Sequence, residues 1–156
     1  MKTISVVTPC YNEELNVRDC YDAVRRVFDE RLQGYRREHI FCDNAYDDRT
    51  VDILREIAAG DPSIKIIINA RNFGPLRNTF NGVMAAGGDA VLLFMPADLQ
   101  DPPELIPDFM KLWEGLRDRL RYPGGARGGP TDARHPQCLL SPADALFRSE
   151  CAARRR

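Results

Sequence analysis

The chain has 156 residues, of which 44% are hydrophobic and 29% are charged, a balance typical of one soluble globular domain. Its formal net charge of −1 gives no general signal for binding to nucleic acid or to a membrane surface. No apolar run approaches the roughly 20 residues that a transmembrane helix needs, so we expect no membrane-spanning segment.

The five cysteines are odd in number, and none is spaced as CxxC. This pattern argues against a disulfide framework and against a zinc site, and it favours a reducing compartment such as the cytoplasm. The chain begins directly with an apolar run, without the basic leader and long apolar core of a signal peptide.

Residues 3–8 form a short β-branched run that predicts a buried strand, and Pro9 is expected to end it. Asn12 is expected to cap the next helix, with the acidic Glu13 at its positive end. This helix should continue to about Leu32. Its inward face is predicted from helical spacing to comprise Val17, Cys20, Tyr21, Val24, Val27 and Phe28.

Residues 38–43 predict a second strand, and Asp47 or Asp48 is expected to cap a second helix. The turn at Asp61-Pro62 leads to a third predicted strand at residues 64–68. The second helix is expected to bury an apolar face made of Val51, Leu54 and Ile57.

Pro75 suits the first turn of a third helix, which should run to about Ala86 and stop at the two glycines that follow. Residues 90–95 predict a fourth strand. Asp101 is expected to cap a last helix. The inward side chains of this helix are predicted to be Leu105, Phe109, Leu112 and Trp113.

Strands and helices therefore alternate four times along residues 1–115. Crossovers of this length predict an α/β fold with a mostly parallel sheet and helices on both faces. Ligands of such sheets bind beyond the carboxyl ends of the strands. The sequence places its polar clusters at those ends, in the loops at residues 9–13, 43–48, 69–74 and 96–101.

Each polar loop taken alone is explained by helix capping, because Asp, Asn and Pro favour helix starts. Together the loops offer a set that suits a nucleotide diphosphate and a divalent metal. Asp98 and the Gln100 amide could hold a cation that neutralises a departing diphosphate, and Arg71 could add a fixed positive charge. Asp43 could accept hydrogen bonds from the base or ribose, and Tyr11 could pack on the base.

The same loops carry a resemblance to a known family. The segments VTPCYNEE, DNA followed by DRT, NARNFG and ADLQDPPE stand in the order and spacing typical of family 2 inverting glycosyltransferases. In particular, the chain resembles the polyprenyl-phosphate sugar transferases related to dolichol-phosphate mannosyltransferase and bactoprenol glucosyltransferase. The resemblance covers roughly residues 3–115, and its most specific stretch begins at Asp98.

The resemblance implies a GT-A fold, a Rossmann-like α/β sheet that is incomplete at its C-terminal side here. It implies a UDP-sugar or GDP-sugar donor with Mg2+ or Mn2+, a polyprenyl phosphate acceptor, no nucleic acid partner, and a place at the cytoplasmic face of a membrane for full-length relatives. Asp98 is the implied catalytic residue and, with Gln100, the implied metal ligand. The donor-site residues assigned are Pro9, Tyr11, Asn12, Glu13, Asp43, Asn44, Asp48 and Arg71.

Two positions depart from the pattern of the family. Pro96 stands where the related mannosyltransferases have the first Asp of the metal motif, so one carboxylate is missing. Tyr46 stands where a small hydroxyl residue is expected beside the nucleotide. An acceptor phosphate is already ionised at neutral pH and can attack without a strong base. We interpret His39 as structural, and the lack of a nearby histidine argues against Cys10 as a nucleophile.

Composition changes near Gly115. Residues 1–115 carry 13 Lys+Arg and 19 Asp+Glu, whereas residues 116–156 carry nine Arg, no Lys, four Asp+Glu and neither Val nor Ile. With little to bury against the entropy cost of ordering, the second segment is predicted to be mostly disordered. We therefore predict a donor-binding domain at 1–115 and a tail at 116–156. A shifted reading frame, a flexible tail without a role and a basic arm for phosphate or anionic lipid all stay open.

Three functions follow from these observations. The first is a glycosyltransferase, and the second is a truncated, inactive relative that binds nucleotide. The third is a phosphoacceptor receiver domain, which needs a central Asp after the third strand and a later Lys. The third strand ends at Asn69 and no lysine follows Lys111, so the receiver domain is disfavoured.

Overall fold

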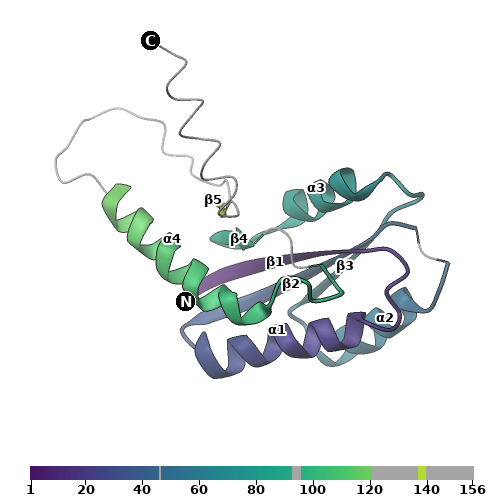
Figure 1. The fold of residues 1–156 in the computed structure, drawn as a ribbon, viewed down its shortest axis with the longest axis horizontal. Helices are drawn as coiled ribbons and strands as arrows, with labels where there is room; N and C mark the ends of the chain where they lie inside the picture. The colour runs from purple at the N-terminus through teal and green to yellow at the C-terminus, as the bar shows by residue number, and fades with distance from the viewer. Residues whose placement is uncertain (46, 93–95, 121–136, 140–156) are drawn as a thin grey trace, which may run out of the picture.

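Five parallel strands form the sheet, in the order β3-β2-β1-β4-β5 (Figure 1). This order places β1, the first strand, in the middle, and the chain then adds strands outward on one side and afterwards on the other. The strands are β1 (Lys2–Cys10), β2 (Tyr35–Asp43), β3 (Ile64–Ile68), β4 (Ala90–Leu92) and β5 (Gln137–Leu139).

The computed structural model describes residues 1–45, 47–92, 96–120 and 137–139. Tyr46, the end of the predicted strand at 90–95 and most of the segment 116–156 lie outside the described residues. The predicted disorder of that segment therefore stays a prediction, as does the domain boundary near Gly115. The sequence did not predict β5, which pairs with β4.

Helices cover both faces of the sheet, which confirms the predicted α/β class. Figure 1 shows α3 on the opposite side of the sheet from α1 and α2. None of the helices in the described part of the chain has both the length and the apolarity needed to cross a bilayer. The helices are α1 (Val17–Arg31), α2 (Thr50–Gly60), α3 (Pro75–Ala85) and α4 (Ile106–Leu120), the last preceded by the 3-10 turn η1 (Pro103–Leu105).

The alternation of side chains along β1 divides the core into two layers. Ile4 and Val6 face the layer that contains α1 and α4, where Phe28, Met110 and Trp113 are buried with them. Val7 faces the other way, into a smaller layer beneath α3. That layer comprises Val7, Ile40, Cys42 and Val91, with Val83 and Ala86 packed against it.

Helical spacing predicted the inward faces of the first two helices correctly. All six predicted residues of α1 and all three of α2 are buried. In the last helix Trp113 and Phe109 pack on the core, but Leu105 and Leu112 are 43% and 62% exposed, so that part of the prediction is wrong. The helix is entered through η1, and this turn presents Ile106 and Met110 to the core instead.

Three predicted boundaries are also wrong. Asn12 does not cap α1, whose N-cap position is Asn16, and Asp101 does not cap the last helix, because η1 begins at Pro103. Pro9 does not end β1, since pairing with β2 continues to Cys10 and needs no N–H from the proline. Pro75 does begin α3, as predicted.

Gly82 allows α3 to lie very close to the sheet. A Cβ atom at this position would come within 2.5 Å of both the Cys42 Sγ and the Val7 Cγ1 atoms. Separations this short do not occur between real atoms, so any side chain would push the helix outward. The close approach also brings the polar inner face of α3 onto the ends of β1 and β2.

We expect Gly82→Ala to lower the free energy of unfolding by about 1–3 kcal/mol, because the added methyl group overpacks the layer beneath α3. Urea denaturation followed by circular dichroism measures this difference. Gly60→Ala is the matched control, since a Cβ there meets nothing within 4 Å. Equal stability of the two variants would show that α3 is not held close to the sheet.

Candidate functional site

The loops that follow β1 and β2 are joined at the carboxyl edge of the sheet. Backbone N–H groups of each loop donate to side-chain oxygens of the other, or of the helix that follows it. The bonds run from Asp47 N to Asn12 Oδ1 at 2.9 Å, from Glu13 N to Thr50 Oγ1 at 2.8 Å, and from Glu14 N to Asp48 Oδ2 at 3.0 Å. The two loops therefore form one unit.

Asp48 holds this unit together through both carboxylate oxygens. Besides the bond from Glu14, its Oδ1 atom accepts a bond of 2.9 Å from the backbone N–H of Thr50, in the first turn of α2. Burial alone would raise the pKa of Asp48, but the bonds from Thr50 and Glu14 outweigh it and lower the pKa below its ordinary value. The predicted helix cap at this residue is thus partly right: the N-cap position is Arg49, yet Asp48 satisfies the Thr50 N–H.

Five asparagines connect the loops after β2 and β3 to α3. Asn44 Nδ2 donates to Asn72 Oδ1 at 2.8 Å, and the Phe73 N–H donates to Asn44 Oδ1 at 2.9 Å. Asn69 lies between Asn44 and the helix. Its Nδ2 atom donates to Asn44 Oδ1 at 3.3 Å and to Asn78 Oδ1 at 2.9 Å. Its Oδ1 atom accepts a hydrogen bond from Asn81 Nδ2 at 2.9 Å.

Asn78 anchors this network to the strand ends. It is 2% exposed, and its Nδ2 donates to the Cys42 carbonyl at 2.7 Å and, at 3.5 Å, to the Cys10 carbonyl. Sequence reasoning missed Asn78 and Asn81 and gave Asn69 no role. An asparagine in place of an expected apolar residue on the inner face of a helix is the signal that could have found Asn78.

Three predicted site carboxylates help to raise the pKa values of the buried Cys10 and Cys20 thiols. Burial raises the pKa of Cys10 well above its ordinary value, and the charges of Asp43 and Glu13 add to this. Burial also raises the pKa of Cys20 to about 12, with smaller contributions from Glu13 and Asp98. Glu13 and Asp43 therefore add negative charge near Cys10, and Glu13 and Asp98 add it near Cys20; the two cysteines are buried in one cluster.

Neither Cys10 nor His39 is placed for catalysis. Cys10 is 2% exposed and its raised pKa disfavours the thiolate that would attack a substrate. His39 is fully buried, lies 2.9 Å from the Thr8 hydroxyl through Nε2 and stacks on Phe41. Burial, followed by the charge of Arg37, lowers the pKa of His39 to about 3, so the ring is neutral.

Asp98 and Gln100 lie together on an exposed loop. Gln100 Nε2 donates to Asp98 Oδ2 at 2.6 Å, and the Gln100 N–H donates to Asp98 Oδ1 at 3.2 Å. Leu99 between them has a φ of 57°, which lets the loop fold back on itself. The described residues contain no cluster of three or more His, Cys, Asp or Glu side chains that could hold a metal ion.

The remaining predicted site residues differ in how open they are. Tyr11 is 46% exposed at the end of β1, whereas Pro9 beside it is half-buried and Asp43 is fully buried. Arg71 is exposed and lies 4.9 Å from the centre of the Phe73 ring. Within the described residues, the structure gives Arg71 no bond to Asp98 or Gln100.

Residues 5–132 match the family model described as Glycosyl transferase family 2. The chain belongs to this family. The family membership, the α/β fold and the resemblance to polyprenyl-phosphate sugar transferases predicted from the four loops are confirmed.

Curated relatives of this family 2 chain include three transferases. An uncharacterized glycosyltransferase, YkcC, of Bacillus subtilis is 40% identical over 70% of this chain and 33% of the relative. A prophage bactoprenol glucosyl transferase homolog of Escherichia coli is 36% identical over 75% of this chain and 37% of the relative. A dolichol-phosphate mannosyltransferase of Pyrococcus furiosus is 34% identical over 80% of this chain and 33% of the relative. The chain thus spans only about a third of the length of these relatives.

Two solved structures share the fold. A mannosyltransferase of Pyrobaculum calidifontis in complex with GDP-Man and Mn2+ superposes with a TM-score of 0.59 at 21% identity, over 69% of this chain and 31% of that one. A glucosyl-3-phosphoglycerate synthase of Mycobacterium tuberculosis in complex with Mn2+, UDP and phosphoglyceric acid superposes with a TM-score of 0.51 at 27% identity, over 74% of this chain and 39% of that one.

We expect Asp48→Ala to lower the free energy of unfolding by about 1–2 kcal/mol at pH 7, because two backbone N–H groups lose their acceptor. The lowered pKa of Asp48 means that its contribution is present above the unfolded-state value of about 3.9 and is lost as the pH falls through the folded-state value. The difference from wild type should therefore shrink below about pH 4.

Urea denaturation at a series of pH values between about 7 and 3 measures this difference. Asp47→Ala, which changes the adjacent exposed carboxylate, is the control and should stay close to wild type. A difference for Asp48→Ala that does not vary with pH would mean that the Asp48 charge does not join the loops.

Proposed function

We propose that this chain binds a UDP-sugar or GDP-sugar at the carboxyl edge of its sheet, and that the whole protein transfers the sugar to a polyprenyl phosphate. The observation that supports this most is the pairing of Asp98 with Gln100, on a loop whose Ala97 and Leu99 pack in the same cluster as Cys10 at the end of β1. Membership of glycosyl transferase family 2 and the names of the bactoprenol and dolichol-phosphate relatives support the reaction class.

The predicted donor-site residues divide into two groups by what they contact. Tyr11 is exposed and free to stack on a base, and Arg71 is exposed and able to meet a phosphate. Asn12, Glu13 and Asp48 are engaged in the bonds that join the loops. We propose that these three shape the donor site.

Asp43 and its neighbours would form the floor of the donor site. Asp43 is fully buried, so a base or ribose would reach it only after neighbouring side chains move aside. Asn44, the next residue, accepts the hydrogen bond from the Phe73 N–H and so fixes the loop after β3. Pro9 is half-buried at the end of β1 and would limit the other side of the nucleoside.

Asp98 and Gln100 would suit a divalent cation that also binds the diphosphate, once the Gln100 amide turns its oxygen toward Asp98 in place of the Nε2 donor. A carboxylate oxygen and an amide oxygen are hard donors, and Mg2+ takes few protein ligands besides water and phosphate. The two solved relatives with Mn2+ support the use of a divalent metal by this fold. Such a cation would stabilise the charge of the leaving diphosphate, which is why we propose Asp98 as the catalytic residue.

A second candidate function is binding of the nucleotide sugar without transfer. It is favoured by Pro96, which stands where the related mannosyltransferases have the first carboxylate of the metal motif. A position at the cytoplasmic face of a membrane also stays a prediction.

We expect one nucleotide among UDP, GDP, UDP-glucose and GDP-mannose to raise the melting temperature of the purified chain, and only when Mn2+ or Mg2+ is present. A ligand that binds only the folded state stabilises it by mass action. Asp98→Ala should abolish the shift, because it removes the one carboxylate of the proposed metal site. Thermal denaturation with each nucleotide, with and without metal, measures this.

Asp101→Ala is the matched control, since Asp101 is an exposed carboxylate three residues away in the same loop. It should keep the full shift. A cooperative melt with no shift for any nucleotide would overturn the proposed donor site. Formation of labelled glycolipid from polyprenyl phosphate would separate the transferase from the binding protein.

A further inference from the structure

The amphipathic character of α3 is largely inverted, although Val83 packs on the layer beneath the helix. Its buried residues are Asn78, Thr79 and Gly82, which are polar or small. Its large apolar residues face outward instead: Leu76 is 77% exposed, Phe80 is 63% exposed and Met84 is 70% exposed. Spacings of four residues place these three side chains on one side of the helix. A helix that covers a sheet in water normally shows the opposite pattern.

The inner face of α3 is polar for reasons already given, since Asn78 binds strand carbonyls and Gly82 allows close approach to the sheet. Nothing in that packing requires Leu76, Phe80 and Met84 to be apolar. Single exposed apolar residues are common, but three in a row on one helix form a patch that calls for a partner. We define the α3 face as Leu76, Arg77, Phe80 and Met84.

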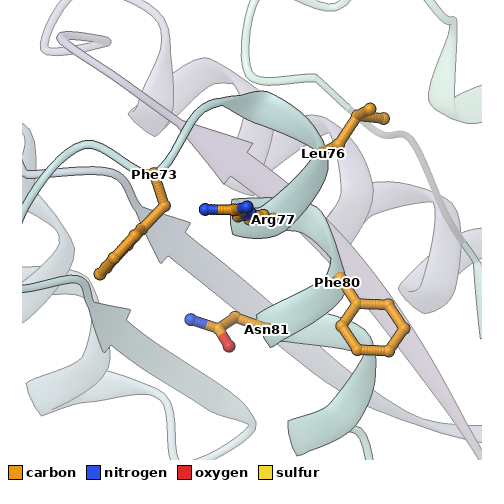
Figure 2. Close-up of a pocket in the computed structure, with 5 residues that line it drawn as sticks. All are labelled: Phe73, Leu76, Arg77, Phe80 and Asn81. Atoms are coloured by element: carbon orange, nitrogen blue, oxygen red, sulfur yellow. The ribbon is translucent and has the colours of Figure 1, made fainter.

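A hollow adjoins the α3 face on the side of the loop after β3. Its volume is about 570 Å³, and it is lined by Phe73, Leu76, Arg77, Phe80 and Asn81. Figure 2 shows Leu76 and Phe80 projecting from one side of the helix, with Arg77 between the helix and Phe73 on the other. The α3 face thus combines aliphatic and aromatic side chains with an arginine.

The segment that carries the α3 face has no acidic residue of its own, and the Glu38 carboxylate that approaches it at Gly87 is paired with Lys65. Residues 62–88 contain no Asp or Glu, although residues 1–115 contain 19. The exposed cations beside the patch are Arg71 and Arg77, and neither makes an ion pair with the described residues. A surface of this composition matches the boundary between anionic headgroups and acyl chains, where apolar side chains enter and arginines meet phosphates.

We propose that the α3 face docks on the surface of an anionic lipid bilayer. A second copy of the chain would bind this face less well. A two-fold contact would bring the Arg77 and Arg71 side chains of both copies together, with no negative charge to offset them. A bilayer with anionic lipids supplies both the apolar environment and the negative charge. The α3 face lies on the surface of the helix, so docking needs no change in the fold.

This docking surface deepens the proposed function, because α3 begins directly after the loop that binds Asn44. The Gly74 N–H donates to Asn72 Oδ1 at 2.8 Å, one residue before the helix starts. Contact of Leu76 and Arg77 with headgroups would therefore hold the carboxyl edge of the sheet near the lipid surface, where a lipid phosphate acceptor lies. Docking itself needs neither nucleotide nor metal.

Flotation of the full chain with vesicles tests the proposal. We expect the chain to bind vesicles of phosphatidylcholine with about 40% phosphatidylglycerol and to bind pure phosphatidylcholine vesicles much more weakly. Leu76→Ser/Phe80→Ser should weaken binding to the anionic vesicles at least about tenfold, and Arg77→Gln about fivefold, the loss expected for one cation near a charged surface. Without donor present, the result is independent of the proposed transferase activity.

Leu112→Ser/Leu116→Ser is the matched apolar control, because both leucines are exposed on α4, and Arg55→Gln on α2 is the charge control. Both should bind like wild type, and circular dichroism should show all variants folded. Equal vesicle binding by wild type and Leu76→Ser/Phe80→Ser would overturn the proposal and assign any binding to the arginines of the tail. A dimer that Leu76→Ser/Phe80→Ser converts to monomer, with unchanged vesicle binding, would also overturn it.

Discussion

The carbonyl groups at the carboxyl ends of β1 and β2 set a constraint on which the rest of the site depends. Where two neighbouring strands end, their buried carbonyls must be hydrogen-bonded, because a buried carbonyl without a partner is costly. Asn78 reaches inward from α3 to the Cys42 and Cys10 carbonyls, and the Asn44 N–H also bonds Cys10. The Oδ1 atom of the same Asn78 side chain accepts a hydrogen bond from Asn69 Nδ2, so the strand ends, the loop after β3 and the helix are fixed by one network.

This constraint explains the character of α3. The helix must lie close to the sheet for the Asn78 side chain to reach the strand ends, and only Gly82 leaves room for that approach beside Cys42 and Val7. An inner face whose fully buried residues are Asn, Thr and Gly, with Val83 partly buried beside them, buries little apolar area, so α3 gains less from the hydrophobic effect than α1 or α2. The helix is held by hydrogen bonds and by its neighbours, and its apolar outer residues are left available for another role.

Sequence patterns predicted what depends on local periodicity. The faces of α1 and α2, the alternation of strands and helices, and the carboxyl edge as the place of the polar loops all follow from spacing and from the parallel topology. Features that depend on distant partners were not predictable in the same way. Asn12 resembles a helix cap, but its side chain is taken by the Asp47 N–H from another loop. Leu112 lies at helical spacing from Leu105 and Phe109, but the helix leaves η1 with Ile106 and Met110 facing the core, and Leu112 faces solvent.

The electrostatics of the edge bear on how a donor could be held there. Glu13, Asp43 and Asp98 bring negative charge near the Cys10 and Cys20 thiols, which are buried in one cluster, and a nucleotide diphosphate would bring further negative charge to this edge. Arg71 is the predicted cation for the phosphates, yet it lies against Phe73 on the loop after β3. Repulsion between carboxylates and phosphates falls only if positive charge is placed between them. With Pro96 in place of the first carboxylate of the motif, Asp98 and Gln100 alone would bind a cation weakly, and the diphosphate oxygens would have to complete its ligand set. Cation and nucleotide would then each need the other, which makes their binding cooperative by linkage.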